Sequence, residues 1–184
     1  DNDEVAIVFE NLRAKNYLLA KKESFLDYDH LKLMMRKLGE FHAYSYRARE
    51  EFSDMFYSLT QSAPEINGFL MNQYPDISAS LMRSFLPLST DPKYGSKTEK
   101  IRHIIAKNTE MLKNALISDK NNPTHVLCHG DFLRNNVLFK YEDGKPIDLK
   151  MIDLATWRFG SPVIDLATVL YLNADQKMRN ENWD

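Results

Sequence analysis

Two aspartates and an asparagine in the last third of the chain have the types and spacing of a phosphate-handling group. Asn136 follows Asp131 after a short polar loop, and Asp153 follows the apolar stretch beyond it. Carboxylate and carboxamide oxygens are the ligands that Mg²⁺ prefers. Such a metal beside a further carboxylate suits phosphoryl transfer, because the metal neutralises phosphate charge while the carboxylate accepts the proton of the attacking hydroxyl.

A β-hairpin is the element that must bring these three side chains together. Apolar residues 137–141 and 147–152 flank Asp143-Gly144, and Asp-Gly between apolar stretches is the strongest local signal for a two-residue hairpin turn. With the turn on this pair, Asn136 faces Met151 and Asp153 lies opposite Arg134. We therefore expect Asp131, Asn136 and Asp153 to face one cleft, with their polar atoms on the order of 4–9 Å apart.

An ordinary structural interpretation competes with this one. Asp, Asn and Gly are common turn residues, and a single Asp at a strand end usually caps or is solvated. The combination of His-Gly-Asp, an Asn five positions after that Asp, a hairpin and then Ile-Asp favours the magnesium site over separate turns.

The rest of the chain predicts a mostly helical body around that hairpin. Residues 5–9 form a β-branched apolar run typical of a short buried strand. Helical spacing of apolar residues predicts helices over 29–50, with Asp27 or Asp29 as N-cap, over 97–117 and over 163–172. Four prolines divide residues 51–92, which predicts short helices joined by turns. Residues 126–128 read as a short strand.

Composition excludes several classes of protein. The chain has 184 residues, of which 43% are hydrophobic and 27% charged, and 24 basic against 26 acidic side chains give a formal charge of −2. A nucleic-acid binder normally has a basic excess. The apolar runs are far shorter than the ~18 residues of a membrane span. With a single cysteine and no secretory signal, we expect a cytoplasmic protein without nucleic-acid or membrane partners.

The motifs together carry a resemblance to a known family. His129-Gly130-Asp131-Phe132-Leu133-Arg134-Asn135-Asn136 is similar to the catalytic loop of the aminoglycoside and choline kinase group, within the protein-kinase-like fold. The chain resembles the ecdysteroid-kinase-like (CHK kinase-like) family more closely, over residues 126–131, 136–140, 143–146, 152–153, 160–162 and 165–166. Residues 9–12 resemble that family's hinge and residues 37–43 its first large C-lobe helix, so the similarity runs from about residue 5 to about residue 171.

The resemblance implies a role for each matching residue. Asp131 would be the catalytic base, and Asn136 and Asp153 would be magnesium ligands. Backbone groups of Glu10, Asn11 and Leu12 would meet the adenine of ATP. His129 would order the catalytic loop and Asp165 would brace it, which makes these two structural supports of the site.

The resemblance also defines the expected fold and domain boundaries. It implies an α+β kinase-like C-lobe, in which residues 1–12 are the last N-lobe strand and hinge and residues 13–184 are the C-lobe. Neither a glycine-rich loop nor a Val-Ala-x-Lys pattern is present. We therefore expect a fragment, cut short at both ends, whose missing N-lobe belongs to the same polypeptide and without which the chain alone is inactive.

Two departures from the family pattern concern packing near the loop. Leu133 stands where the family usually has Trp, and Leu154 where it usually has Phe. Gly130 occupies the position of the protein-kinase Arg that pairs with an activation-loop phosphate, which favours a small-molecule acceptor over a protein.

Two functions are compatible with these motifs. The first is an ATP- and Mg²⁺-dependent kinase that phosphorylates a hydroxyl of a small molecule, and the resemblance implies an ecdysteroid or a xenobiotic alcohol. The alternative is a pseudokinase or small-molecule-binding protein on the same scaffold. The presence of Asp131, Asn136 and Asp153 favours the enzyme, because folding alone does not require them.

Overall fold

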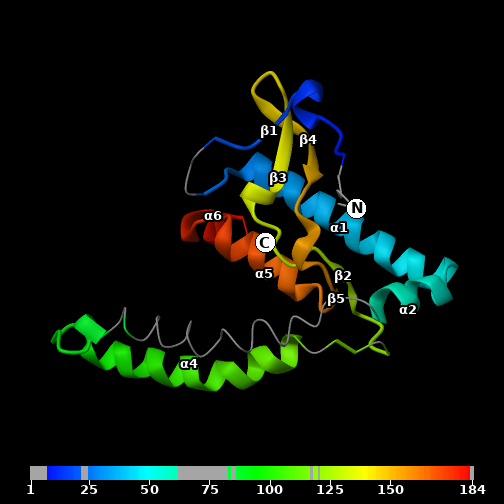
Figure 1. Cartoon of the computed structure of the whole chain (residues 1–184). Helices are drawn as coiled ribbons and strands as arrows, with labels where there is room; N and C mark the ends of the chain where they lie inside the picture. Colours follow the sequence, from blue (N-terminus) through cyan, green and yellow to red (C-terminus); the bar gives the residue numbers. More distant parts are fainter. Residues whose placement is uncertain are drawn as a thin grey trace, which may run out of the picture. The chain divides into compact units, whose positions relative to one another are not determined.

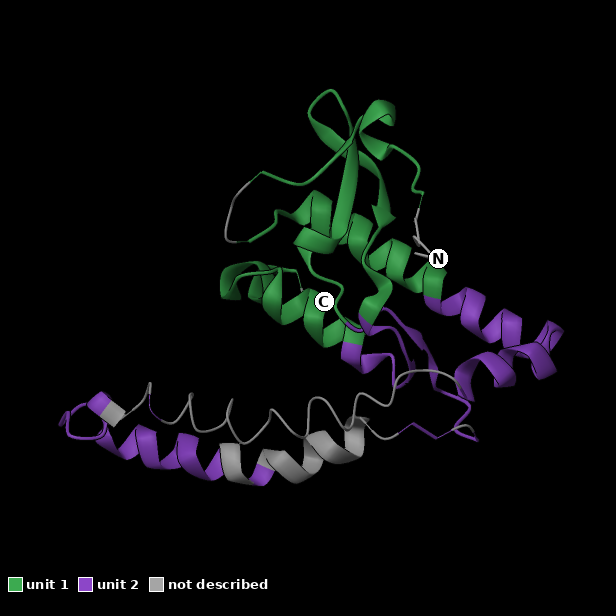
Figure 2. Ribbon diagram, in the orientation of Figure 1, with its two compact units in different colours: residues 1–41, 131–155, 165–184 green, residues 42–130, 156–164 purple. Residues whose placement is uncertain are grey.

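The computed structural model describes residues 8–21, 25–61, 83, 86–116, 118–119 and 121–182. The chain divides into two compact units, each assembled from segments that are distant in sequence (Figure 2). Unit 1 comprises residues 1–41, 131–155 and 165–184, and unit 2 comprises residues 42–130 and 156–164. All three of the side chains predicted to handle phosphate belong to unit 1.

The described residues form a mixed α/β fold (Figure 1). The helices are α1 (Tyr28–Glu51), α2 (Ser53–Gln61), α4 (Gly95–Leu116), α5 (Val163–Leu172) and α6 (Gln176–Glu181). The strands are β1 (Tyr17–Leu18), β2 (Val126–Cys128), β3 (Val137–Glu142), β4 (Lys145–Met151) and β5 (Arg158–Gly160). Single turns of 3₁₀ helix span Leu12–Lys15, Leu86–Leu88, Arg134–Asn136 and Leu154–Thr156. Within the described ranges, no helix combines the length and apolar character that crossing a bilayer requires.

The three helices predicted from apolar spacing are confirmed, with ends within two residues. Of the two candidate caps of α1, Asp27 is the cap, because its Oδ1 accepts the backbone N–H of His30 at 3.1 Å. Short helical segments in residues 51–92 are confirmed by α2 and the 3₁₀ turn at Leu86–Leu88. Residues 62–82 and 84–85 of that stretch lie outside the described residues.

The strand predicted over residues 5–9 is not observed where it can be examined. Residues 5–7 lie outside the described residues, and Val8 and Phe9 belong to no strand and are 93% and 82% exposed. A strand needs a neighbour for its backbone groups, and none of the described strands pairs with these two residues. The prediction of burial is therefore wrong for Val8 and Phe9.

The predicted hairpin is formed by β3 and β4, and the predicted turn residues Asp143 and Gly144 have positive φ angles of 48° and 76°. Two such residues make the type I′ turn that matches strand twist. The predicted register holds next to the turn, where Glu142 pairs with Lys145. A bulge between Lys140 and Tyr141 then shifts it by one residue, so that Met151 pairs with Val137 instead of Asn136.

Strand β1 extends the hairpin to a sheet of order β1-β3-β4, which the sequence did not predict. Tyr17 and Leu18 pair with Lys140 and Phe139. The Tyr17 hydroxyl donates a 2.5 Å hydrogen bond to Asp148 Oδ2 on β4, which raises the pKa of the phenol. The Lys37 ammonium lies 3.4 Å from Asp148 Oδ1. Asp148 therefore joins β1, β4 and α1.

The acid sensitivity of unit 1 is expected to depend on Asp148. Burial works to raise its pKa, but hydrogen bonds from Tyr17, the Leu149 N–H and Lys37 together hold the pKa below its ordinary value. Such a carboxyl stabilises the fold above its unfolded pKa, and this stability is lost as pH falls through the folded pKa. We expect Asp148→Asn to lower the free energy of unfolding by about 1 kcal/mol at neutral pH, a difference that shrinks below about pH 4.

Urea unfolding of wild type and Asp148→Asn at several pH values tests this predicted pH dependence of stability. Tyr17→Phe is the matched control, since it removes the donor and keeps the carboxylate. An Asp148→Asn deficit of equal size at acid and neutral pH would show that the charge contributes nothing.

Unit 1 has a buried apolar core that joins its helices to the β3–β4 hairpin. Side chains of α1, the loop after Gly130, the hairpin and the C-terminal segment form one buried apolar cluster. Its members are Leu26, Leu31, Leu33, Met34, Leu38, Phe132, Val137, Phe139, Leu149, Val169 and Ala174. The loop that carries Asp131 is thus anchored by Phe132 on one side and Val137 on the other.

Unit 2 contains the second sheet, in which β2 pairs antiparallel with β5. Phe159 of β5 packs edge-on against Phe56 and His125, with ring centroids 5.7 and 5.8 Å apart. The Leu127 N–H donates to Ser45 Oγ at 2.7 Å, and the Arg49 guanidinium donates to the Pro123 carbonyl at the same distance. These bonds hold β2, the strand that ends one residue before His129 in the sequence.

Candidate functional site

The chain enters the site through His129 and Gly130. Gly130 has a φ of +86°, and a Cβ at this position would lie 2.0 Å from the Thr156 carbonyl oxygen. Arg158 Nη2 donates to the Gly130 carbonyl at 3.1 Å, and Thr156 Oγ1 donates to the His129 carbonyl at 3.4 Å. Only glycine fits here, because the conformation is left-handed and the neighbouring backbone is too close for a side chain.

Asp131 and Asn136 are in direct contact. Asn136 Nδ2 donates to Asp131 Oδ2 at 2.8 Å and to the Asp131 carbonyl at 2.9 Å, while Asn136 Oδ1 accepts from Asn135 Nδ2 at 3.1 Å. Asn136 is buried, with 4% of its surface exposed. The separation of about 4–9 Å expected for this pair is therefore wrong, because the amide donates directly to the carboxylate.

Asp153 follows the end of β4 in a left-handed backbone conformation. Its φ is +61°, which few non-glycine residues adopt and which often marks a functional site. The preceding Ile152 N–H donates to the Asn136 carbonyl at 3.0 Å, so this bond joins one predicted metal ligand, Asn136, to the residue before the other, Asp153. The predicted pairing of Asp153 with Arg134 is corrected by the register shift, which places Ile152 against Asn136.

A residue that the sequence did not single out holds the loop in place. Asn173, fully buried after α5, accepts the Arg134 N–H on its Oδ1 at 2.8 Å. Its Nδ2 donates to the Phe132 and Thr168 carbonyls at 3.2 Å each. Asn173 thus binds the loop between Asp131 and Asn136, which makes it a positioning residue.

The two predicted supports of the site are both buried. His129 follows β2 in unit 2, and Asp165 lies in the first turn of α5 in unit 1. Each has 0% of its surface exposed. Burial of a polar side chain implies a structural use, since unpaired polar groups are costly inside a protein. Their support of the catalytic loop stays a prediction.

The predicted hinge residues lie at the start of the 3₁₀ turn Leu12–Lys15. Asn11 caps this turn, with Oδ1 accepting the Ala14 N–H at 3.3 Å. Glu10 forms an ion pair with Lys15, whose hydrogen bond lowers the pKa of the Glu10 carboxyl. The Leu12 N–H donates to the Glu10 carbonyl at 3.0 Å, so these two backbone groups satisfy one another.

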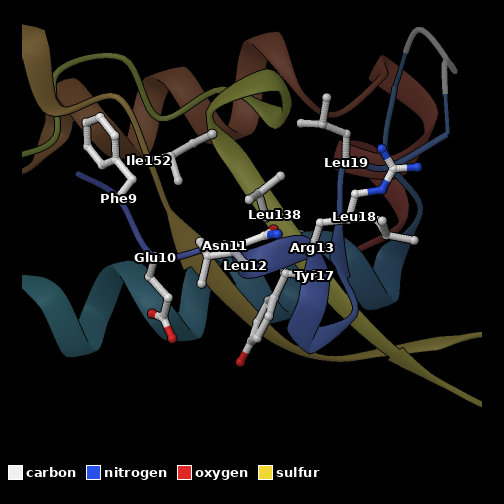
Figure 3. A pocket seen from close by; sticks show the side chains of 10 residues that line it. All are labelled: Phe9, Glu10, Asn11, Leu12, Arg13, Tyr17, Leu18, Leu19, Leu138 and Ile152. Carbon is white, nitrogen blue, oxygen red and sulfur yellow. The ribbon is translucent and has the colours of Figure 1, made fainter. Parts of the chain in front are cut away.

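A cavity of about 460 Å³ joins the predicted hinge residues to the hairpin. In Figure 3, Phe9 and Ile152 lie at one end of this hinge cavity, and the Glu10 carboxylate points away from them. The cavity is within the size range of small-molecule sites, and most of its wall is apolar. It is lined by Phe9, Glu10, Asn11, Leu12, Arg13, Tyr17, Leu18, Leu19, Leu138 and Ile152. It therefore reaches from all three predicted nucleotide-binding residues to the neighbour of Asp153.

These features define a class of protein. A mixed α/β chain with an Asp–Asn loop, a following hairpin and an aspartate after its second strand is compatible with a kinase-like fold. A sequence model of the Ecdysteroid kinase-like family matches residues 1–184. The chain belongs to this family, whose members are kinase-like phosphotransferases, and the resemblance drawn from the motifs is confirmed. No curated protein and no solved structure matches the chain.

Proposed function

We propose that this chain carries the nucleotide, magnesium and general-base groups of a kinase that transfers the γ-phosphoryl group of ATP to a hydroxyl of a small molecule. The observation that carries the proposal is the continuity of unit 1 from the hinge cavity, through Ile152, to the Asp131–Asn136 pair. In the same proposal, residues 1–12 comprise the end of the N-lobe and the hinge, and residues 13–184 are the C-lobe.

The hinge cavity supports adenine binding through the backbone. An adenine edge offers a ring nitrogen as acceptor and an amino group as donor, next to each other. The Leu12 N–H and the Glu10 carbonyl offer the complementary pair and now bond to each other. A bound base would therefore replace one internal hydrogen bond by two, while Leu138 and Ile152 contact its faces.

The oxygen donors near the catalytic loop fit Mg²⁺. Asp153 would supply a carboxylate oxygen and Asn136 a carboxamide oxygen, which are the ligand types that this hard cation prefers. When bound, Mg²⁺ with ATP supplies the activated phosphoryl group and neutralises its charge. Asn136 Oδ1 accepts from Asn135 Nδ2, and Asn136 would give up this hydrogen bond to hold the metal.

Asp131 is the proposed general base. Its Oδ2 accepts from Asn136 Nδ2, which orients the carboxylate, and carboxylate oxygens have further lone pairs for the acceptor hydroxyl. His129 and Asp165 support the loop. Gly130 leaves no room for the arginine with which protein kinases bind an activation-loop phosphate, which supports a small-molecule acceptor such as an ecdysteroid or a xenobiotic alcohol.

Magnesium-dependent nucleotide binding tests the proposal. We expect the chain to bind an ATP analogue more tightly with Mg²⁺ than with a chelator, and Asp153→Asn to abolish this difference because it removes the charge of a metal ligand. Asp143→Asn is the matched control, since Asp143 also has positive φ but lies in the hairpin turn. NMR-detected titration measures the ratio of the two affinities, with Mg²⁺ and with the chelator, even where both affinities are low. An unchanged ratio in Asp153→Asn would contradict the metal site.

A further inference from the structure

A second cavity of about 490 Å³ lies on unit 1 beside the turn end of the hairpin. Its wall combines the apolar side chains of Leu18, Leu19, Ala20, Phe25 and Leu26 with Lys21, Asp27, His30, Tyr141 and the backbone at Gly144. Asp131, Asn136 and Asp153 do not line it. The cavity is thus separate from the groups proposed for phosphoryl transfer, and its volume is in the range of small-molecule sites.

Three polar side chains form a hydrogen-bonded row along this cavity. His30 Nδ1 lies 2.6 Å from Asp27 Oδ1, and His30 Nε2 lies 2.9 Å from the Tyr141 hydroxyl oxygen. The His30 ring is fixed from a third side by Phe139, whose ring centroid is 4.8 Å away in an edge-to-face arrangement. The row connects the N-terminus of α1 to β3.

The chemistry of the row sets the direction of each hydrogen bond. Burial works to raise the pKa of Asp27, but the hydrogen bonds from the His30 ring and backbone hold it below its ordinary value. Ionised Asp27 only accepts, so Nδ1 of His30 carries a proton, and Nε2 accepts from the Tyr141 O–H in the tautomer that has its proton on Nδ1. Burial, with the Asp27 charge, raises the pKa of Tyr141, which keeps the phenol protonated. The Tyr141 oxygen then retains a lone pair for another donor.

The charge on the wall indicates an uncharged ligand. Among the residues that the structure describes, one cation, Lys21, and one anion, Asp27, line the cavity, so their charges balance. Phe25 is 43% exposed and Leu19 55% exposed, and both present apolar surface at this cavity. We propose that the cavity binds a small uncharged molecule with an apolar body and one hydroxyl group, which donates a hydrogen bond to the Tyr141 oxygen.

This site does not depend on the proposed function. Leu18 and Leu19 line both cavities, whereas Phe25 and Tyr141 line only this one. Substitutions at Phe25 and Tyr141 therefore probe the second cavity without altering a residue assigned to nucleotide or metal.

Fluorescence titration with naphthylmethanol and with its methyl ether, in buffer at about pH 8, tests the proposal. The two probes share the apolar body, and only the alcohol has a donor. We expect wild type to bind the alcohol about three- to tenfold more tightly than the ether, the value of one hydrogen bond. Tyr141→Phe is expected to remove this preference by weakening the alcohol alone, and Phe25→Ala to weaken both probes.

Equal binding of the two probes by wild type, or an alcohol preference that survives in Tyr141→Phe, would overturn the proposal. Chemical shifts locate the site independently of the variants. Shifts at Phe25 and Tyr141 on addition of the alcohol support the proposal, and shifts confined to Phe9 and Ile152 contradict it.

Discussion

Asp131→Asn is expected to reduce phosphoryl transfer by about 10²–10⁴-fold while changing the affinity for Mg²⁺-ATP by less than about twofold. The carboxamide has the shape of the carboxylate, and its oxygen can still accept the 2.8 Å hydrogen bond from Asn136 Nδ2. The loop geometry is therefore preserved. The variant loses only the ability to take a proton from the acceptor hydroxyl.

The measurement is transfer of labelled phosphate from ATP to a lipophilic alcohol found by screening, in a polypeptide that contains this chain together with a kinase N-lobe. Asp143→Asn, in the hairpin turn, makes the same chemical change away from the site and should retain full turnover. Wild-type turnover in Asp131→Asn would exclude Asp131 as the base. A variant that also loses nucleotide binding would assign Asp131 to the metal instead.

Gly130→Ala is expected to have the largest effect on stability. At Gly130 a Cβ would lie 2.0 Å from the Thr156 carbonyl oxygen and 2.9 Å from its carbon, at a φ of +86°. At Gly144 the φ is +76°, but a Cβ would meet nothing within 4 Å. Left-handed backbone costs an alanine about 1–2 kcal/mol, so Gly144→Ala should lose about that amount. Gly130→Ala should lose about 3–5 kcal/mol, because backbone must also move.

Urea unfolding of the two variants measures the difference directly. The movement in Gly130→Ala also displaces the Gly130 carbonyl, which accepts from Arg158. Because Gly130 directly precedes Asp131, phosphoryl transfer should fall at temperatures where the variant is still folded. Equal losses in the two variants would show that the close approach to Thr156 carries no strain.

Local sequence signals predicted those elements whose geometry a few residues determine. Asp143 and Gly144 tolerate positive φ better than other residues, so the turn of the hairpin was predictable. The sequence narrowed the cap of α1 to Asp27 or Asp29, and the hydrogen bond from the His30 N–H in the structure identifies Asp27. The bulge was not predictable. Strict alternation along β4 would place Ile147 on the same buried face as Leu149. With the bulge, Ile147 is 47% exposed while Leu149 is buried.

Contacts between distant segments account for what the sequence did not predict. Strand β1 has two residues and exists because Tyr17 and Leu18 pair with β3, so no pattern within β1 identifies it. Asn173 follows an apolar helix like many C-terminal asparagines, yet its Nδ2 donates to a carbonyl 41 residues earlier. The types of the site residues were readable from the motif, whereas the direct Asp131–Asn136 hydrogen bond required the folded loop.

The central claim is that Asn136 and Asp153 hold the metal of a nucleotide bound at the hinge. Paramagnetic broadening of backbone NMR signals by Mn²⁺ with a non-hydrolysable ATP analogue tests it most directly, because Mn²⁺ takes the same oxygen ligands as Mg²⁺. We predict that the signals of Asp131, Asn136 and Asp153 broaden first. Those of Asp143 and Gly144, separated from the site by roughly 20 Å of strand, should stay sharp. Broadening centred on any other part of the described chain, or uniform along it, would contradict the account.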